Sequence, residues 1–197
     1  MSTATPTAPR LARVITDALA PAYLVMGILL LVGWHSTGDL SGLGWGVLAA
    51  LFCGGIPFAV ILLGVKLGHW TDKHVKIRTQ RAIPLSATMA SVLLGVSLLV
   101  VFDAPQEVLA LVIAMLVGLA ATTAVTIWWK VSVHTAVAAG VVTILIQVYG
   151  LAMTPLLLAI AAIGWSRVAL RDHTTAQTMA GAALGATAAA VTFGLLR

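Results

Sequence analysis

The chain has 197 residues, of which 60% are hydrophobic and only 9% are charged. Because a soluble globular domain carries roughly 25% charged residues, this composition excludes a soluble globular protein and predicts an integral membrane protein. The formal net charge of +5 does not indicate a nucleic-acid partner, because the basic residues of a membrane protein mostly record its topology.

The amino-terminal residues 1–14 are polar and rich in threonine and proline, which predicts a disordered tail ahead of a single transmembrane domain over residues 15–197. Seven apolar stretches follow, near residues 18–34, 44–66, 83–102, 106–128, 133–150, 152–165 and 174–196. Most of them approach the ~20 residues that a helix needs to cross the hydrocarbon core, and none alternates as the strands of a barrel would. The expected fold is an all-α polytopic membrane bundle of about six to seven transmembrane helices.

Small residues inside the apolar stretches indicate packing. Cys53 is the only cysteine and lies within an apolar stretch, which is typical of a small core residue. The segments GAALG at 181–185 and GVKLG at 64–68 each place two glycines on one helix face. This spacing is typical of membrane helices that pack closely against a neighbour.

The charged residues divide the expected loops into two sets. If every apolar stretch crosses the membrane, the acidic residues Asp39, Asp103 and Glu107 share one side. The other side holds most of the cations, at Arg10, Arg13, Lys73, Lys76, Arg78, Arg81, Lys130, Arg167 and Arg171. The positive-inside rule places the basic side in the cytoplasm. We therefore expect a protein of a bacterial plasma membrane whose amino terminus and basic loops are cytoplasmic.

Three polar clusters lie on the basic side. They are DKHVKIRTQRAIP at 72–84, WKVSVHTA at 129–136 and SRVALRDHTTAQ at 166–177. Each lies at the end of an apolar stretch, and an even number of expected crossings separates each cluster from the next. The three loops can therefore converge on one shallow site.

Two of these clusters open helices. Ser132 and His134 stand at the start of the stretch at 133–150, and Asp172 and His173 stand at the start of the stretch at 174–196. The unpaired N–H groups and the dipole of a helix N-terminus favour an anion with several oxygens, such as phosphate. Arginines add planar forks that bind phosphate oxygens two at a time.

The order of these clusters resembles the motifs of the type 2 phosphatidic acid phosphatase superfamily, a family of membrane lipid phosphatases. That family carries K-x6-R-P, then P-S-G-H, then S-R-x5-H-x3-D. Ser166 and Arg167 are followed by five residues and then His173, so the third motif matches up to its last position. Ser132 and His134 match two positions of the second motif. The resemblance covers residues 72–185, and its strength is the three-part order.

The sequence departs from the family pattern at several positions. Arg81 matches the arginine of the first motif, but His74 stands where the lysine is expected and Ala82 replaces the proline. Valines at 131 and 133 replace the proline and glycine around the serine of the second motif. Gln177 replaces the final aspartate, and a glutamine can orient the imidazole one turn away but cannot supply a negative charge.

The resemblance implies hydrolysis of a phosphate or diphosphate ester of a lipid, either a polyprenyl lipid or a glycerolipid, without a metal or other cofactor. In that chemistry His173 is the nucleophile that becomes a phosphohistidine, and His134 is the general acid and base. The implied phosphate ligands are Arg81, Arg167, Ser132, Lys73 and His74, with Gln177 and Ser166 as orienting residues.

Two other functions stay open. A non-hydrolytic relative would bind a phosphorylated lipid in the same pocket, and the replacements at Val133 and Gln177 keep this alternative in place. A transporter is less well supported, because transporters usually carry broken helices and charges at mid-membrane, whereas these charges lie at helix ends.

Overall fold

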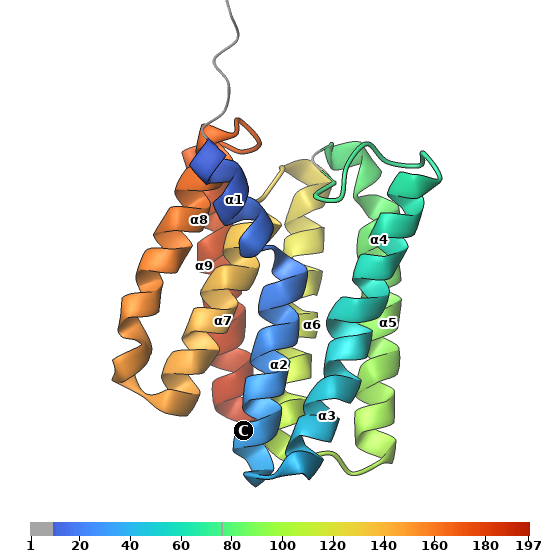
Figure 1. The fold of residues 1–197 in the computed structure, drawn as a ribbon, viewed down its shortest axis with the longest axis vertical. Coiled ribbons are helices and arrows are strands. Elements are labelled where there is room, and N and C mark those ends of the chain that lie inside the picture. The colour runs from blue at the N-terminus through green and yellow to red at the C-terminus, as the bar shows by residue number, and fades with distance from the viewer. Residues whose placement is uncertain (1–9, 76) are drawn as a thin grey trace, which may run out of the picture.

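A computed structural model describes residues 10–75 and 77–197, and in these residues the chain forms a bundle of helices without a strand (Figure 1). The helices are α1 (Arg10–Ala18), α2 (Pro21–Thr37), α3 (Leu40–Ala50), α4 (Ile56–Lys66), α5 (Ala82–Val101), α6 (Gln106–Trp128), α7 (Val133–Tyr149), α8 (Leu157–Ala169) and α9 (Thr175–Leu196). Each of the seven predicted apolar stretches is helical, so the all-helical fold class is confirmed.

The helices are compatible with a membrane bundle. Five segments are long and apolar enough to cross a membrane, namely Leu40–Lys66, Arg78–Val101, Gln106–Trp128, Leu151–Ala169 and Thr175–Leu196. Helices α1 and α2 together make a sixth candidate with a bend of 40°, and α7 is shorter, at 17 residues. The number of candidate spans is thus five to six, against the predicted six to seven.

The amino-terminal flank differs from its prediction. Residues 1–9 lie outside the described residues, but α1 begins at Arg10, so the disorder predicted for residues 10–14 is wrong. The buried residues Ala12 and Thr16 lie on α1, which packs against α8. Pro21 at the start of α2 separates the two helices, because a proline is favoured in the first turn of a helix and disrupts the interior of one.

The span formed by α3 and α4 contains a π-helical turn at Leu51–Gly55. Pro57 has no N–H to donate to the carbonyl four residues earlier, which accounts for the irregular turn at this point. Cys53 lies in this turn and is buried, as its apolar context predicts.

Close packing of α9 on α7 fixes the start of α7. A Cβ added at Gly185 would lie 1.9 Å from the carbonyl oxygen of Ala136, and one at Gly181 would lie 2.4 Å from that of Ser132. Only glycine allows this approach, so the predicted packing face at 181–185 is confirmed. The segment at 64–68 behaves differently, because Gly64 packs against the indole of Trp70 in the following loop and not against another helix.

The three polar clusters and α1 lie at one end of the bundle (Figure 1). The loop between α4 and α5, the segment before α7 and the turn between α8 and α9 all lie there, whereas the C-terminus lies at the other end (Figure 1). The fold thus brings together loops that are far apart in sequence.

Candidate functional site

Hydrogen bonds join the three clusters in sequence order. Arg81 Nη1 donates to the carbonyl of Val131 at 2.9 Å, which links the first cluster to the second. The backbone N–H of Ser132 donates to the carbonyl of Gln177 at 3.2 Å, and Lys130 Nζ donates to the carbonyl of Asp172 at 2.5 Å. The clusters therefore lie together, as the even number of crossings between them predicts.

Arg81 is a buried residue that holds two loops. Its Nε donates to the carbonyl of Val75 at 3.0 Å, in addition to the bond from Nη1 to the segment before α7. Val75 has a φ of +43°, a left-handed conformation that a β-branched residue rarely adopts. The arginine side chain thus stabilises an unusual backbone turn beside the predicted phosphate ligands Lys73 and His74.

Arg167 is the most enclosed cation of the site. It is only 1% exposed, and its Nη2 forms an ion pair with Asp172 Oδ2 at 3.0 Å. Its Nε and Nη1 atoms are buried and have no hydrogen-bond partner among the described residues. A buried charged donor without an acceptor is costly. The oxygens of an anion would satisfy these nitrogens, as the sequence predicts for Arg167.

His134 lies in the first turn of α7 and is 5% exposed. Its ring meets the ring of His74 edge to face, with the centroids 5.1 Å apart. The Nε2 atom of His134 is buried and also lacks a partner within the part of the chain that the structure describes. Ser132, which is 0% exposed, is the N-cap of α7 and accepts the N–H of Thr135 at 3.4 Å.

His173 lies in the turn before α9, whose N-cap is Thr174. Gln177 Oε1 accepts the backbone N–H of Thr174 at 3.1 Å, so the orientation of this amide is set by the helix cap. The same oxygen lies 3.2 Å from His173 Nδ1, which must therefore be the donor. This arrangement leaves the lone pair of the neutral imidazole on Nε2.

The charge state of His173 follows from its surroundings. Burial lowers its pKa to about 3, and the positive charges of Arg81, Lys130 and Arg167 act in the same direction. His173 is therefore neutral at physiological pH. A neutral imidazole with a free Nε2 lone pair has the form that a nucleophile requires.

Ser166 lies apart from the imidazoles. Its hydroxyl is 0% exposed, lies 3.0 Å from the hydroxyl of Thr16 on α1, and donates to the carbonyl of Ile163 at 2.8 Å. Ser166 thus ties α1 to α8, and its orienting role in the site stays a prediction.

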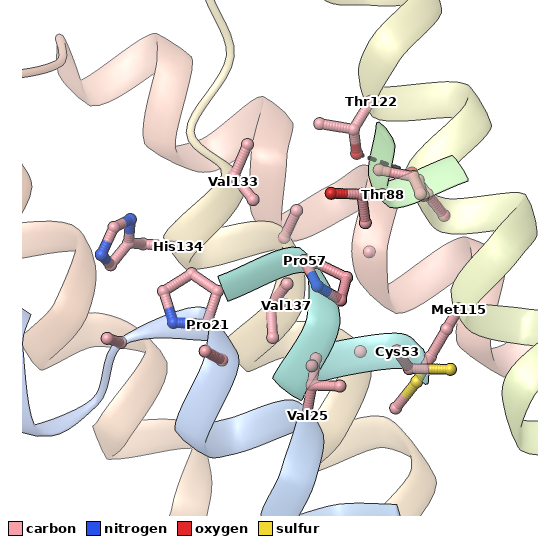
Figure 2. Close-up of a pocket in the computed structure, with 18 of the residues that line it drawn as sticks. Pro21, Val25, Cys53, Pro57, Thr88, Met115, Thr122, Val133, His134 and Val137 are labelled. Atoms are coloured by element: carbon pink, nitrogen blue, oxygen red, sulfur yellow. Dashed lines mark hydrogen bonds between the residues drawn. The ribbon is translucent and has the colours of Figure 1, made fainter. Parts of the chain in front are cut away.

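A cavity of about 270 Å³ runs from the polar end into the bundle (Figure 2). Charged and polar groups line its mouth, namely Asp17, Lys73, His74, Arg81 and His134. The remaining lining is mostly apolar and comes from α2, the π-helical turn, α4, α5, α6 and α7, including Val25, Cys53, Pro57, Met115 and Val137. Figure 2 shows His134 at one end of this lining and Cys53 with Met115 at the other.

The two expected catalytic histidines face different spaces. His134 lines the cavity, whereas His173 borders a shallow hollow together with Lys130, Asp172 and Gln177. The paired rings that line the cavity are those of His74 and His134, and His173 is not part of its lining.

Sequence reasoning missed Asp17. Its Oδ1 atom lies 2.8 Å from Lys73 Nζ and 3.0 Å from His74 Nε2, so it contacts two predicted phosphate ligands. The signal was present, because Asp17 is the only acidic residue in the otherwise basic segment ahead of the first apolar helix.

Comparison with known proteins adds no relative to this picture. No family model, no curated protein and no solved structure matches the chain. The resemblance to the lipid phosphatases therefore depends on the order and spacing of the three clusters in the sequence.

Proposed function

We propose that this protein is a membrane phosphatase that hydrolyses a phosphate or diphosphate ester of a lipid. The observation that carries the proposal is the buried guanidinium of Arg167, whose Nε and Nη1 lack acceptors among the described residues. Its charge acts on His74, which lines a mostly apolar cavity. A phosphate supplies the missing acceptor oxygens, and a hydrocarbon chain fills the apolar space. A phosphorylated lipid carries both groups in one molecule.

The size of the cavity favours one hydrocarbon chain. Protein interiors contain few voids larger than a water molecule, so an apolar space of about 270 Å³ suggests an occupant. Pockets for drug-sized ligands span roughly 300–1,000 Å³, so this volume suits a single chain better than two. Replacing Val137, on the cavity wall, by Phe should weaken binding of a long-chain phosphate, whereas Val101→Phe on an exposed surface of α5 should not.

The proposed reaction has two steps. His173 Nε2 attacks phosphorus and the bond from phosphorus to the lipid oxygen breaks. His134, which takes up a proton from water when the anionic phosphate binds beside it, gives that proton to the lipid oxygen. Water then attacks the phosphohistidine, His134 takes a proton from the water, and inorganic phosphate leaves. Arg167 and Arg81 stabilise the charge that accumulates on the phosphoryl oxygens. Because His173 does not line the cavity, binding of the ester must bring the phosphate between the two histidines.

We further propose that the site faces the cytoplasm of a bacterial cell. The supporting observation is the concentration of cations at the site end of the chain, including Arg10 and Arg13 on α1. Cysteines introduced at Thr71 and Thr37, which are exposed at opposite ends, should differ in access to a membrane-impermeant reagent. Labelling of position 71 but not of position 37 from outside intact cells would reverse the orientation.

A non-hydrolytic lipid-binding protein is the second candidate. Gln177 favours it, because this side chain orients His173 but contributes no negative charge to stabilise an imidazolium. The deciding measurement is release of inorganic phosphate by the purified protein from a panel of prenyl and glycerolipid phosphates. Tight binding of these lipids without any release of phosphate would select the second candidate.

A further inference from the structure

The mouth of the cavity contains a carboxylate that lies outside all three motifs. One oxygen of Asp17 on α1 accepts hydrogen bonds from Lys73 Nζ at 2.8 Å and from His74 Nε2 at 3.0 Å, and all three residues line the cavity. The preceding residue, Thr16, bonds to Ser166 and so holds this part of α1 against α8. The carboxylate itself is held by Lys73 and His74 and not by the bond from Thr16.

His74 occupies the position at which the motif has a lysine. The positive charge of that lysine is present here only if the imidazole of His74 is protonated. A lysine is cationic at neutral pH, whereas an unperturbed imidazole has a pKa of about 6.5. Burial lowers the pKa of His74, and the charges of Arg167 and Lys73 lower it as well. The hydrogen bond and the negative charge of Asp17 oppose these effects without outweighing them, so the pKa of His74 stays below its usual value until a further negative charge arrives.

We propose that Asp17 is a positioning residue that lets His74 take up a proton when a phosphate binds, so that His74 binds the phosphate of a lipid as an imidazolium, in the role of the motif lysine. The two ring nitrogens explain why the carboxylate matters. With Nε2–H bound to Asp17, a neutral ring would present a lone pair at Nδ1, which repels a phosphate oxygen. The imidazolium presents an N–H there instead. This inference rests on the proposed function, because it requires a phosphate at the site.

Asp17 differs from the other charged groups around His74 because its carboxylate bonds to the imidazole ring. Asp72 accepts the backbone N–H of His74 at 2.8 Å, whereas Asp17 bonds to the ring itself. The charged and titratable groups that face His74 come from every neighbouring element: Asp17 from α1, Lys73 and Asp72 from its own loop, His134 from α7 and Arg167 from α8. Among these, the carboxylate of Asp17 is the one placed to favour a proton on the ring.

The test is a double-mutant cycle on the full chain in detergent, with dodecyl phosphate as the ligand and dodecanol as its uncharged control. Near pH 7, Asp17→Asn should weaken binding of dodecyl phosphate by about tenfold in the parent, as expected for the loss of a charge-assisted hydrogen bond. In the His74→Lys background the same substitution should change binding by less than about twofold, because a lysine needs no carboxylate to stay charged. Asp17→Glu should retain most of the parent affinity.

The pH profile provides a readout that a purely structural role would not change. Dividing the affinity of the parent by the affinity of His74→Lys at each pH removes the effect of titration of the phosphate group of the ligand. This affinity ratio should fall as pH rises through the pKa of His74. The corresponding ratio for Asp17→Asn, which is its affinity divided by the affinity of the Asp17→Asn variant in the His74→Lys background, should fall at a lower pH. Histidine ¹⁵N spectra of the ligand-free protein should show the same downward movement for His74. The matched control is Thr16→Val, which removes the bond from α1 to Ser166 but should leave the pH profile unchanged.

Three outcomes would overturn the inference. Equal losses from Asp17→Asn in the parent and in His74→Lys would mean that Asp17 only supports the fold. Tighter binding in both backgrounds would mean that Asp17 is an internal anion that competes with phosphate. In both cases binding of dodecyl phosphate would persist and the proposed function would stand. If neither the parent nor any variant prefers dodecyl phosphate to dodecanol, the proposed function and the inference both fail.

Discussion

The polar side chains at the two ends of the bundle differ in burial and in hydrogen bonding; Figure 1 shows the two ends. At the end that carries the C-terminus, Asp39 caps α3 and His35 pairs with Glu107 at 2.9 Å, and these side chains are exposed or half-buried. At the opposite end, Arg167 and His134 are buried and carry nitrogens that have no partner among the described residues. Water can complete the hydrogen bonds of the first group but not those of the second.

This difference supports the proposal that one end of the bundle is structural and the other carries the site. Polar groups that only terminate helices are satisfied locally, as the bonds from the N–H groups of Ser41 and Gly42 to Asp39 illustrate. A site for a charged ligand must instead hold its donors in place before the ligand arrives, and it does so at a cost in stability. The C-terminal end therefore provides matched control residues for each test of the site.

The largest expected effect comes from removing the proposed nucleophile. His173→Ala should reduce turnover of a lipid phosphate by about 10³-fold or more, because the phosphohistidine can no longer form. His35→Ala removes a histidine at the opposite end and should leave turnover unchanged. The measurement is phosphate release by both purified variants. Full activity of His173→Ala would refute the proposed mechanism and remove the functional contrast between the two ends.

The second prediction concerns the fork of Arg167. Arg167→Lys keeps the positive charge but loses the planar guanidinium and its Nε–H donor, so turnover should fall by about 10²-fold, the usual effect of removing one donor to a developing oxyanion. The matched control is Arg197→Lys at the opposite end, where the arginine bonds to a backbone carbonyl of α7. Equal kcat values for Arg167→Lys and Arg197→Lys would show that Arg167 is structural.

The third prediction concerns the negative charge that Gln177 does not supply to His173. Gln177→Glu should preserve the helix cap, since glutamate also serves at this position of a capping box. It should also place a carboxylate beside His173 Nδ1. We expect turnover to rise by at least about tenfold, because orienting and basic groups of this kind contribute 10²–10⁴-fold. Gln177→Asp is shorter and serves as the paired variant.

The control for added charge is Gln106→Glu at the opposite end, which should not change turnover. A parent that binds lipid phosphates while both variants at position 177 remain inert would favour the non-hydrolytic protein. A loss of activity in Gln177→Glu alone would instead show that the present tautomer of His173 depends on the amide.

The sequence predicted the helices and the meeting of the clusters, because apolar length and motif order are local properties. It could not predict that His74 pairs with His134, because this contact depends on the path of the loop between α4 and α5. Nor could it predict that Asp17 lies between Lys73 and His74, because this contact depends on the bend between α1 and α2. The same holds for the cavity, whose lining comes from several helices and the π-helical turn. Periodicity reports which residues face a neighbour but not how far apart two helices stand.

The smallest expected effect is the dependence of stability on pH, which should also differ between the ends. The pKa of His173 is about 3 in the folded protein, because of burial and nearby cations, and about 6.5 when unfolded. Between these values the unfolded chain binds more protons, so the site end loses stability as pH falls from about 6.5 toward 3. Burial of His74 contributes in the same direction.

Asp39 behaves in the opposite way, because hydrogen bonds from Ser41 and Thr37 lower its pKa to about 2. Its stabilising contribution is therefore present above about pH 3.8 and is lost only as pH falls toward 2. Between about pH 6.5 and 4.5, the apparent Tm of the protein in detergent should fall by several degrees. His173→Gln should reduce this slope, whereas Asp39→Asn should lower the Tm at every pH in this range without changing the slope. A slope that is the same in the parent and in His173→Gln would show that His173 is solvated, and the contrast between a buried and an exposed end would lose its electrostatic basis.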